Sequence, residues 1–204
     1  MICLIFARGG SKRLPNKNIK NFCGKPLIYW TINFAEKTKL FSKIIVSTDS
    51  KKIAKIAIKC GAEVPELRPK KYSTDNSKEW VAWKYAVRKY LNNKDSNIII
   101  FPVTSPLREK SDVIKGLKLY DNKKTDLVLG ITNTNHNPNF NMVKVNSSKN
   151  LSIYNSNIIK QKYKQSFNVT TVMYITNSNY IISNNHMFAG NVKGVIIPKE
   201  RSID

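Results

Sequence analysis

The sequence predicts an α/β fold with a Rossmann-like, mostly parallel sheet that carries helices on both faces. Short apolar runs alternate with helical patterns along the 204-residue chain, as they do in parallel sheets built from strand–helix units. The apolar runs lack the period-two polarity of half-exposed strands, so both faces of the sheet are expected to be buried. Hydrophobic residues make up 41% of the chain, which is ordinary for a globular protein with one core.

Three strands and three helices are predicted in the first half of the chain. The strands are 2–7, 43–47 and 62–64, and the helices are 26–37, 51–60 and 77–91. Ile28 and Ile32 lie on one side of the first helix, and Ile53 and Ala57 do so in the second. Gly61 is suited to end the second helix, because glycine readily adopts the left-handed conformation found just after a helix.

The second half continues the pattern after one interruption. The predicted strands are 97–101, 127–131, 169–175 and 192–197, and the helices are 111–119 and 178–183. Ser111 is placed to cap the first of these helices. We expect the strand at 169–175 to resume the parallel pattern.

The interruption lies between about residues 133 and 168. It is rich in asparagine, serine and lysine, and its short apolar pieces at 142–145 and 151–154 indicate a hairpin. We therefore expect a core formed by residues 1–132 and 169–204, with residues 133–168 inserted as an arm.

The net charge of the chain is extreme. The chain has 35 lysines and arginines against 13 aspartates and glutamates, a formal charge of +22. Such a charge attracts polyanions, so a basic nucleic-acid-binding protein is an alternative interpretation. The cations are mostly lysines spread along the whole chain, without a basic block interleaved with aromatic residues. We therefore interpret most of them as solvated surface and do not expect nucleic acid as a partner.

The cysteines and the apolar runs indicate the compartment. Cys3, Cys23 and Cys60 lack metal-binding spacing and are odd in number, which favours a reducing environment. Cys3 lies in the first predicted strand and is expected to be a small buried hydrophobe. No apolar run approaches transmembrane length, and Arg8 interrupts the first one too early for a signal peptide. We expect a cytoplasmic protein without a membrane partner.

A basic glycine turn, residues 7–18, follows the first strand. Gly9 and Gly10 let the backbone approach a ligand closely, and cations neutralise phosphate oxygens. The four cations of the turn are Arg8, Lys12, Arg13 and Lys17. The turn has neither the Walker spacing nor the third glycine of the Rossmann fingerprint. It predicts a site for an anion with several charges, and a nucleoside triphosphate is the expected ligand.

Polar residues follow the ends of three predicted strands. Arg8 comes after the first, Asp49 after the second, and Thr104 and Ser105 after the strand at 97–101. The carboxyl ends of parallel strands share one edge of a sheet, where ligands bind. We expect these residues to converge on one crevice, although Asp49 and Ser77 are also suited to be simple helix caps.

Six ordered segments carry a resemblance to a known family. They are Ala7–Ile19, Gly24–Ile28, Val46–Asp49, Arg68–Pro69 with Ser73–Asp75, Thr104–Arg108 and Ile196–Asp204. In this order and spacing they resemble the acylneuraminate cytidylyltransferases, which activate nine-carbon keto-sugar acids. The resemblance covers essentially the whole chain and implies a fold of the nucleotidyltransferase type.

The resemblance also implies a reaction. The anomeric hydroxyl of the sugar acid attacks the α-phosphorus of CTP, and pyrophosphate leaves. Catalysis then depends on positioned positive charge, for which Arg8, Lys12 and Lys17 are the implied residues. The implied nucleotide-binding residues are Ala7, Gly9, Gly10, Ser11, Asn18, Asp49, Arg68 and Ser77.

The sugar, the metal and the partner subunit are implied in the same way. The implied sugar-binding residues are Thr104, Ser105, Arg108 and Gln161. The implied cofactor is Mg²⁺, which takes one or two carboxylates besides phosphate oxygens, and Asp204 matches the first aspartate of the family's metal pair. The family usually forms a homodimer in which an arm from each subunit reaches the other's site, and residues 133–168 fit that arm.

The sequence departs from the family on the sugar side. Pro102 stands where many members have glutamine, and Lys160–Lys162 and Thr170–Thr171 replace other common residues. The sugar is therefore left open among N-acetylneuraminic, legionaminic, pseudaminic and less familiar acids. A Kdo-type or other sugar nucleotidyltransferase is the alternative within enzymes.

Overall fold

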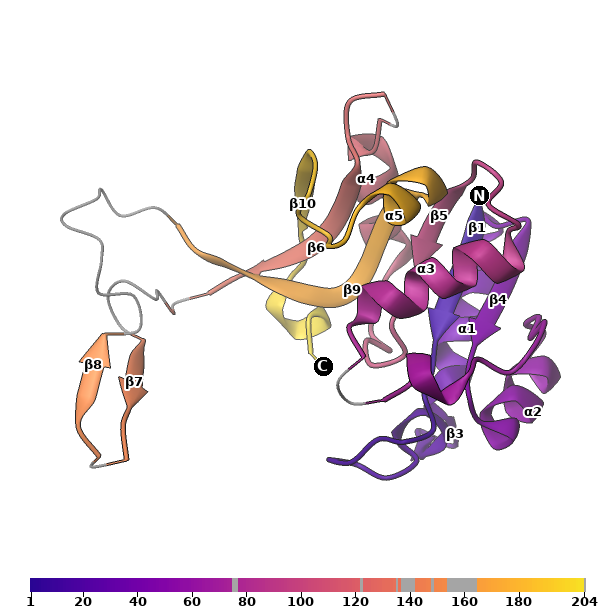
Figure 1. Ribbon diagram of the computed structural model, residues 1–204, viewed down its shortest axis with the longest axis horizontal. Coiled ribbons are helices and arrows are strands. Elements are labelled where there is room, and N and C mark those ends of the chain that lie inside the picture. Colours follow the sequence, from indigo (N-terminus) through magenta and orange to yellow (C-terminus); the bar gives the residue numbers. More distant parts are fainter. Residues whose placement is uncertain are drawn as a thin grey trace.

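A six-stranded sheet forms the centre of the molecule, in the order β10-β6-β9-β5-β1-β4 (Figure 1). The computed structural model describes residues 1–74, 77–121, 123–134, 136, 142–147, 149–153 and 165–203. The strands are β1 Ile2–Phe6, β4 Lys43–Ser47, β5 Asn97–Ile100, β6 Leu127–Asn133, β9 Phe167–Asn177 and β10 Val192–Ile196. Apart from the expected hairpin at 142–154, every strand expected from the sequence is in this sheet except 62–64, which forms a single bridge from Glu63 to Ile45.

The direction of β9 corrects one prediction. The pairs β1–β4, β1–β5 and β6–β10 are parallel, so the sheet is mostly parallel as expected. Strand β9, however, runs antiparallel to both β5 and β6, so the prediction of a parallel strand at 169–175 is wrong. The reason is that β9 pairs directly with β6, with Asn133 opposite Phe167. The two strands form a long hairpin, and hairpin partners are antiparallel.

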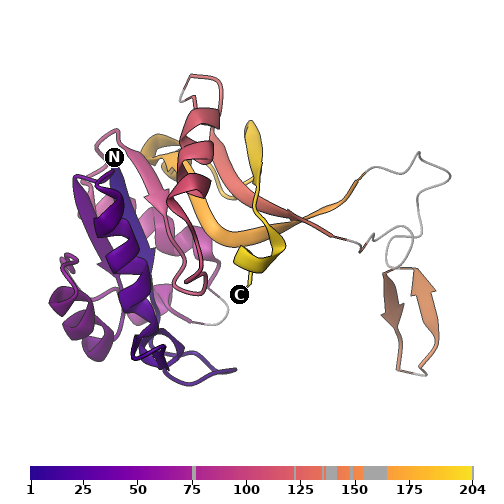
Figure 2. The same ribbon diagram turned by 180° about the vertical axis from the view of Figure 1, so that it is seen from behind.

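Helices cover both faces of the sheet. Helices α1 Leu27–Thr38, α2 Lys51–Lys59 and α4 Lys110–Leu119 lie on one face (Figure 2), and α3 Glu79–Tyr90 and α5 Ser178–Ser183 lie on the other (Figure 1). Along β1, Cys3 and Ile5 enter the first layer and Leu4 enters the second. Because both faces are buried, the strands can be apolar throughout, which explains the missing alternation.

The residues at the ends of α2 and α4 show which of the predicted helix caps and stops are present. Ser50 caps α2, because its Oγ accepts a hydrogen bond from the Ile53 N–H at 3.4 Å. Gly61 follows α2 with a φ of +92°, as predicted for its role after the helix. The cap of α4 is Glu109, which forms a capping box with Asp112. The prediction of Ser111 as the cap is therefore wrong: Glu109, two residues upstream, accepts from the N–H of Asp112, and the Asp112 carboxylate accepts from the N–H of Glu109.

The smaller elements lie outside the main sheet. They are β2 Asn21–Phe22, β3 Lys25–Pro26, β7 Val143–Val145, β8 Leu151–Ile153, and the 3-10 turns η1 Lys17–Ile19, η2 Lys70–Tyr72 and η3 Lys199–Arg201. Strands β7 and β8 pair as the expected antiparallel hairpin, which stands apart from the sheet (Figure 1). The division into a core and an arm at residues 133–168 stays a prediction.

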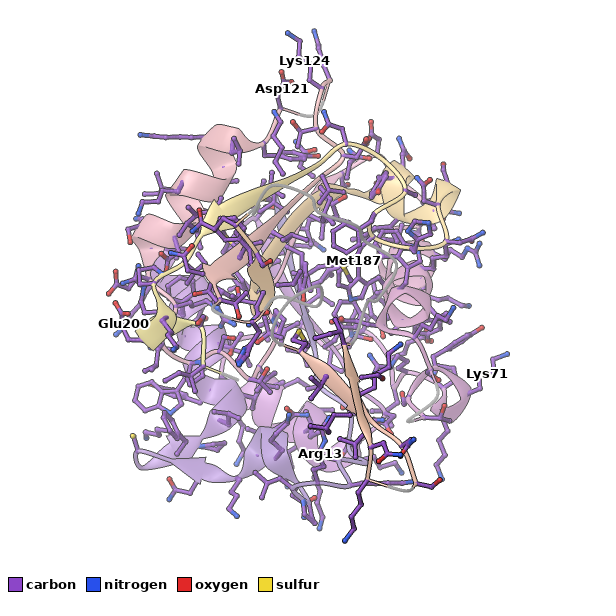
Figure 3. All side chains as sticks on the ribbon, turned by 90° about the vertical axis from the view of Figure 1, so that its left-hand side faces the viewer. Arg13, Lys71, Asp121, Lys124, Met187 and Glu200 are labelled. Carbon is purple, nitrogen blue, oxygen red and sulfur yellow. The ribbon has the colours of Figure 1, made fainter. Side chains whose placement is uncertain are left out.

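The surface carries cations on several sides. Figure 3 shows Lys71 and Lys124 pointing outward from separate parts of the molecule. This distribution agrees with a charge that is spread along the sequence. None of the helices in the described part of the chain has the length and apolar character that a membrane crossing requires.

Candidate functional site

A polar cavity of about 320 Å³ opens where the parallel strands end. Three segments line it: the turn after β1, the stretch from Arg68 into the start of α3, and the loop after β5. Arg8 and Thr104, far apart in the sequence, therefore meet as the strand order predicts. Asp49 follows β4 but does not line the cavity.

The basic turn supplies one wall of the cavity. Arg8, Ser11, Lys17 and Asn18 all line it. Lys12 is exposed on the same turn, outside the lining. Several cations against a pocket of this size favour an anionic ligand, since a phosphate group can engage two or more of them at once.

The two glycines of the turn differ in their surroundings. A Cβ on Gly9 would lie 3.0 Å from the Cβ of Ser50, so the turn passes too close to the start of α2 for a larger residue. Gly10 is exposed, and a Cβ there would meet nothing within 4 Å. The Gly9 N–H donates to Asp49 Oδ1 at 2.8 Å. The Gly9 N–H is therefore engaged by the protein itself.

Ala7 joins the turn to the sheet. It is fully buried, and its N–H donates to the Ser47 carbonyl at 3.1 Å. Its contribution is to continue the pairing of β1 with β4 up to the first residue of the turn.

Arg68 forms the floor of the cavity. Its side chain is buried, donates to Ser73 Oγ at 2.8 Å and to the Ser47 carbonyl at 3.3 Å, and lies over the ring of Phe6. Burial lowers its pKa, and nearby Asp49 partly opposes that shift. These hydrogen bonds go to neutral oxygens, so positive charge is retained at a buried wall, where an anion would be stabilised most.

Ser77 lies on the opposite rim. Its Oγ donates to the Lys71 carbonyl at 3.0 Å and lies 2.7 Å from Thr74 Oγ1. The N-cap of α3 is Lys78, so Ser77 is not the helix cap, which leaves the hydroxyl at the cavity. Trp80 and Trp83, in the helix that follows, are buried in the core.

The loop after β5 is held by buried contacts. Thr104 lines the cavity, whereas Ser105 is fully buried with its Oγ 2.8 Å from Thr171 Oγ1. Arg108 is also buried: Nε donates to the Val172 carbonyl at 3.0 Å and Nη1 to Thr31 Oγ1 at 3.2 Å.

The third donor of Arg108, Nη2, reaches the Pro102 carbonyl, and the guanidinium lies 4.9 Å from the centre of the Phe101 ring. Burial lowers its pKa. The structure therefore places Arg108 under the loop and not in the cavity, and these contacts do not support the predicted sugar contact.

Two predicted site residues, Gln161 and Asp204, lie outside the described residues. Among the described ones, no group of three or more His, Cys, Asp or Glu side chains could hold a metal ion by itself. Mg²⁺ needs only one or two carboxylates when phosphate oxygens complete its shell. The donor set is therefore compatible with a Mg²⁺ that binds together with a nucleotide.

One element near the carboxyl end of the described chain was not anticipated. Arg201 in η3 forms a bidentate ion pair with Asp112 of α4: Nη2 donates to Oδ1 at 2.7 Å, and Nε donates to Oδ2 at 3.0 Å. Asp112 is fully buried, so this bidentate pair fixes the turn that precedes Asp204. The capping-box spacing of Glu109 and Asp112 was the available signal in the sequence.

Glu79, a further unpredicted residue, contributes a carboxylate to the cavity.

A mostly parallel α/β sheet whose first strand opens into a basic turn beside a polar cavity defines a nucleotide-binding protein of the nucleotidyltransferase type. The comparisons agree with this class. The Cytidylyltransferase family matches residues 2–188, and the chain belongs to that family.

Curated relatives and a solved structure give the range of similarity. The chain is 28% identical over 208 residues to the post-translational flagellin modification protein B of Campylobacter coli, covering 100% of this chain and 88% of the relative. It is 30% identical over 207 residues to an N-acylneuraminate cytidylyltransferase of Escherichia coli, covering 100% of this chain and 48% of the relative.

A solved CMP:2-keto-3-deoxy-manno-octonic acid synthetase complexed with CTP matches with a TM-score of 0.69 at 14% identity, covering 97% of this chain and 89% of that one. At this identity the likeness shows the fold. The aligned segments cover about half the length of several curated relatives, among them 48% of the Escherichia coli protein, which aligns with the whole of this chain.

Proposed function

We propose that this chain is a cytidylyltransferase that joins CMP to a sialic-acid-like, nine-carbon sugar acid and releases pyrophosphate from CTP. Membership of the Cytidylyltransferase family and similarity to an N-acylneuraminate cytidylyltransferase support the reaction. The observation that carries the proposal is the basic turn after β1, which places Arg8 and Lys17 in the wall of a cavity at the carboxyl edge of the sheet.

In this proposal the cations of the turn bind the triphosphate and stabilise the negative charge that develops during the reaction. Arg8 and Lys17 hold the triphosphate in the cavity, and Lys12 approaches it from the exposed side of the turn. As the anomeric hydroxyl of the sugar attacks the α-phosphorus, charge grows on the α-phosphoryl group and on the leaving pyrophosphate. Fixed cations stabilise that charge without reorganisation. Asn18 beside Lys17, together with Arg68 and Ser77 from the other lining segment, positions the nucleotide.

A magnesium ion is the proposed cofactor. When bound, it neutralises phosphate charge and promotes departure of pyrophosphate. Asp204 is the proposed ligand, together with phosphate oxygens, and the Arg201–Asp112 pair holds the turn from which Asp204 follows.

The arm is proposed to complete the sugar side of the site in a homodimer. In the β7–β8 hairpin Val143 lies opposite Ile153, and Val145 lies opposite Leu151. These four aliphatic residues therefore share one face, and each is between 38% and 67% exposed. A lone two-stranded hairpin is barely stable in water, so a second copy of the chain is a suitable cover, with Gln161 of the arm among the proposed sugar contacts.

A cytoplasmic location is part of the proposal. The described cysteines are all free, in keeping with a reducing compartment.

The test is pyrophosphate release with Mg²⁺ and CTP across a panel of N-acetylneuraminic, legionaminic, pseudaminic and Kdo-type acids. ATP, GTP and UTP serve as nucleotide controls. Release with CTP and one nine-carbon acid is the expected result and identifies the sugar. Release with the Kdo-type acid alone would replace the proposed substrate class.

Silence across the panel, with no effect of CTP on the melting temperature, would contradict the proposal. Binding to nucleic acid that collapses steeply with salt would then favour the polyanion alternative.

A further inference from the structure

One peptide unit in the basic turn is held from both ends. The carbonyl of Arg8 accepts a hydrogen bond from Asn18 Nδ2 at 3.0 Å. The N–H of Gly9, which belongs to the same peptide unit, donates to Asp49 Oδ1 at 2.8 Å. Because a peptide unit is planar, fixing its oxygen and its N–H fixes its orientation. A fixed plane on this side of the Arg8 Cα restricts the direction in which the Arg8 side chain leaves the backbone.

Asp49 acts from a rigid corner of the fold. Thr48 before it is fully buried, and the Thr48 carbonyl accepts a hydrogen bond from the Arg68 N–H at 2.7 Å. Ser50 after it donates its N–H to Thr48 Oγ1 at 3.1 Å and caps α2. The corner between β4 and α2 therefore holds the carboxylate in place, and the close approach of Gly9 to Ser50 keeps the turn against that corner.

Asn18, the second residue that holds this peptide unit, is also fixed in position. It is 7% exposed and lies in η1, directly after Lys17. The same short turn thus provides a cation for the cavity wall and an amide that holds the turn containing Arg8.

The position of Asp49 does not suit a direct contact with a ligand in the cavity. Its neighbours Arg8 and Arg68 line the cavity, but Asp49 does not. Behind the turn it instead holds a backbone N–H and lies near two cations that face the ligand.

We propose that Asp49 is a positioning residue which, together with Asn18, clamps the Arg8–Gly9 peptide so that the Arg8 guanidinium is aimed at the phosphates before they bind. The catalytic part of this inference rests on the proposed function. The clamp leaves Gly10, at the exposed tip, as the glycine of the turn that adapts to the ligand.

Two variants of Asp49 separate position from charge. Asp49→Asn keeps an oxygen at the same distance and loses the charge, whereas Asp49→Glu keeps the charge and displaces the oxygen. We expect Asp49→Asn to retain kcat within about threefold. Asp49→Glu should lose about 10²-fold in kcat, the order found when reacting groups are misplaced by about an ångström, with a much smaller change in KM for CTP. Glu63→Gln, an equal loss of charge at an exposed position paired with Lys43, is the control.

A second readout does not depend on turnover. Hydrogen exchange of the Gly9 amide, followed by NMR, should be slow in the wild type and in Asp49→Asn, and fast in Asp49→Glu. In a double-mutant cycle on kcat, Asn18→Ala and Asp49→Glu should combine to less than the product of their separate effects, because they act on the same peptide.

The opposite order of the variants would overturn the inference. If Asp49→Asn were as impaired as Asp49→Glu and shifted the Mg²⁺ titration, the charge of Asp49 would act on metal or nucleotide directly. Fast Gly9 exchange in the wild type would also refute the clamp. If no sugar acid supports turnover, the proposed function fails, while the exchange measurement still decides whether the clamp exists.

Discussion

The turn after β1 and the arm that leaves β6 start from the same edge of the sheet, yet they are built in opposite ways. The turn is held by contacts from its own chain: Asp49 from the β4–α2 corner, and Asn18 from η1. The β7–β8 hairpin instead presents an aliphatic face to its surroundings. At the proposed nucleotide end of the site, the turn is thus held within one chain, whereas the arm end offers an aliphatic surface for a partner to cover.

The largest expected effect comes from removing the arm. Because β6 and β9 form a hairpin, with the Thr134 N–H 3.4 Å from the Ser166 carbonyl, residues 134–166 can be replaced by an Asn-Gly turn. We expect a monomer in sedimentation that keeps its CTP-induced rise in melting temperature. Turnover with the sugar acid should fall about 10³-fold or more, because contacts that orient the substrate are lost. If the wild type is a monomer, or if the shortened chain keeps full turnover, the arm does not need a second chain to complete the site, and the contrast with the turn after β1 is wrong.

The next effect tests the nucleotide end. Lys17→Ala should lower kcat by about 10²–10³-fold, since it deletes one fixed cation from the wall of the cavity. The melting temperature should stay within a degree or so, because an exposed or half-exposed lysine contributes little to stability. Lys20→Ala, an exposed position in the same segment that does not line the cavity, is the matched control. Equal activity of the two variants would show that the cavity is not the phosphate site.

Arg108 tests whether the loop after β5 belongs to the scaffold or to the sugar side. Arg108→Leu should reduce the free energy of unfolding by about 3 kcal/mol, because buried carbonyl groups lose their donors. The KM for CTP in the remaining folded enzyme should change little. Urea unfolding and steady-state kinetics measure the two quantities. A normal stability with a raised KM for the sugar acid would restore the predicted substrate contact.

The smallest expected effect is at the rim. Ser77→Ala removes a hydroxyl that lines the cavity, and we expect CTP affinity to fall by about three- to tenfold, the equivalent of one neutral hydrogen bond. Calorimetric titration of CTP gives the value, with Ser111→Ala on exposed α4 surface as the control. If the affinity for CTP does not change, Ser77 does not contact the nucleotide, and its hydroxyl serves only the contacts with Thr74 and the Lys71 carbonyl.

The parts predicted correctly from the sequence rest on local signals. The apolar run at Ile2–Phe6 and the glycines that follow it lie next to each other in the sequence, and the helical spacing of Ile53 and Ala57 is equally local. The rule that parallel strands end at one edge then placed Arg8 and Thr104 at the same cavity.

The parts predicted wrongly or missed depend on contacts between distant residues. The burial of Arg108 was missed, because its partners Thr31 and Val172 lie 77 and 64 residues away; its sugar contact stays a prediction. The direction of β9 depends on pairing across the arm. At α4, the capping box of Glu109 and Asp112 replaces the predicted Ser111 cap, and Asp112 is also held by Arg201, 89 residues away.

The antiparallel strand β9 also sets the order in which the molecule can be assembled during synthesis. It lies between β5 and β6, so the middle of the sheet is one of the last parts to leave the ribosome. Until then the edge of β5 has no partner, and at roughly 5–20 residues per second the delay lasts for seconds. An open strand edge invites pairing with other chains. The arm, which the chain must finish first, thus determines how long the nascent protein is exposed to aggregation.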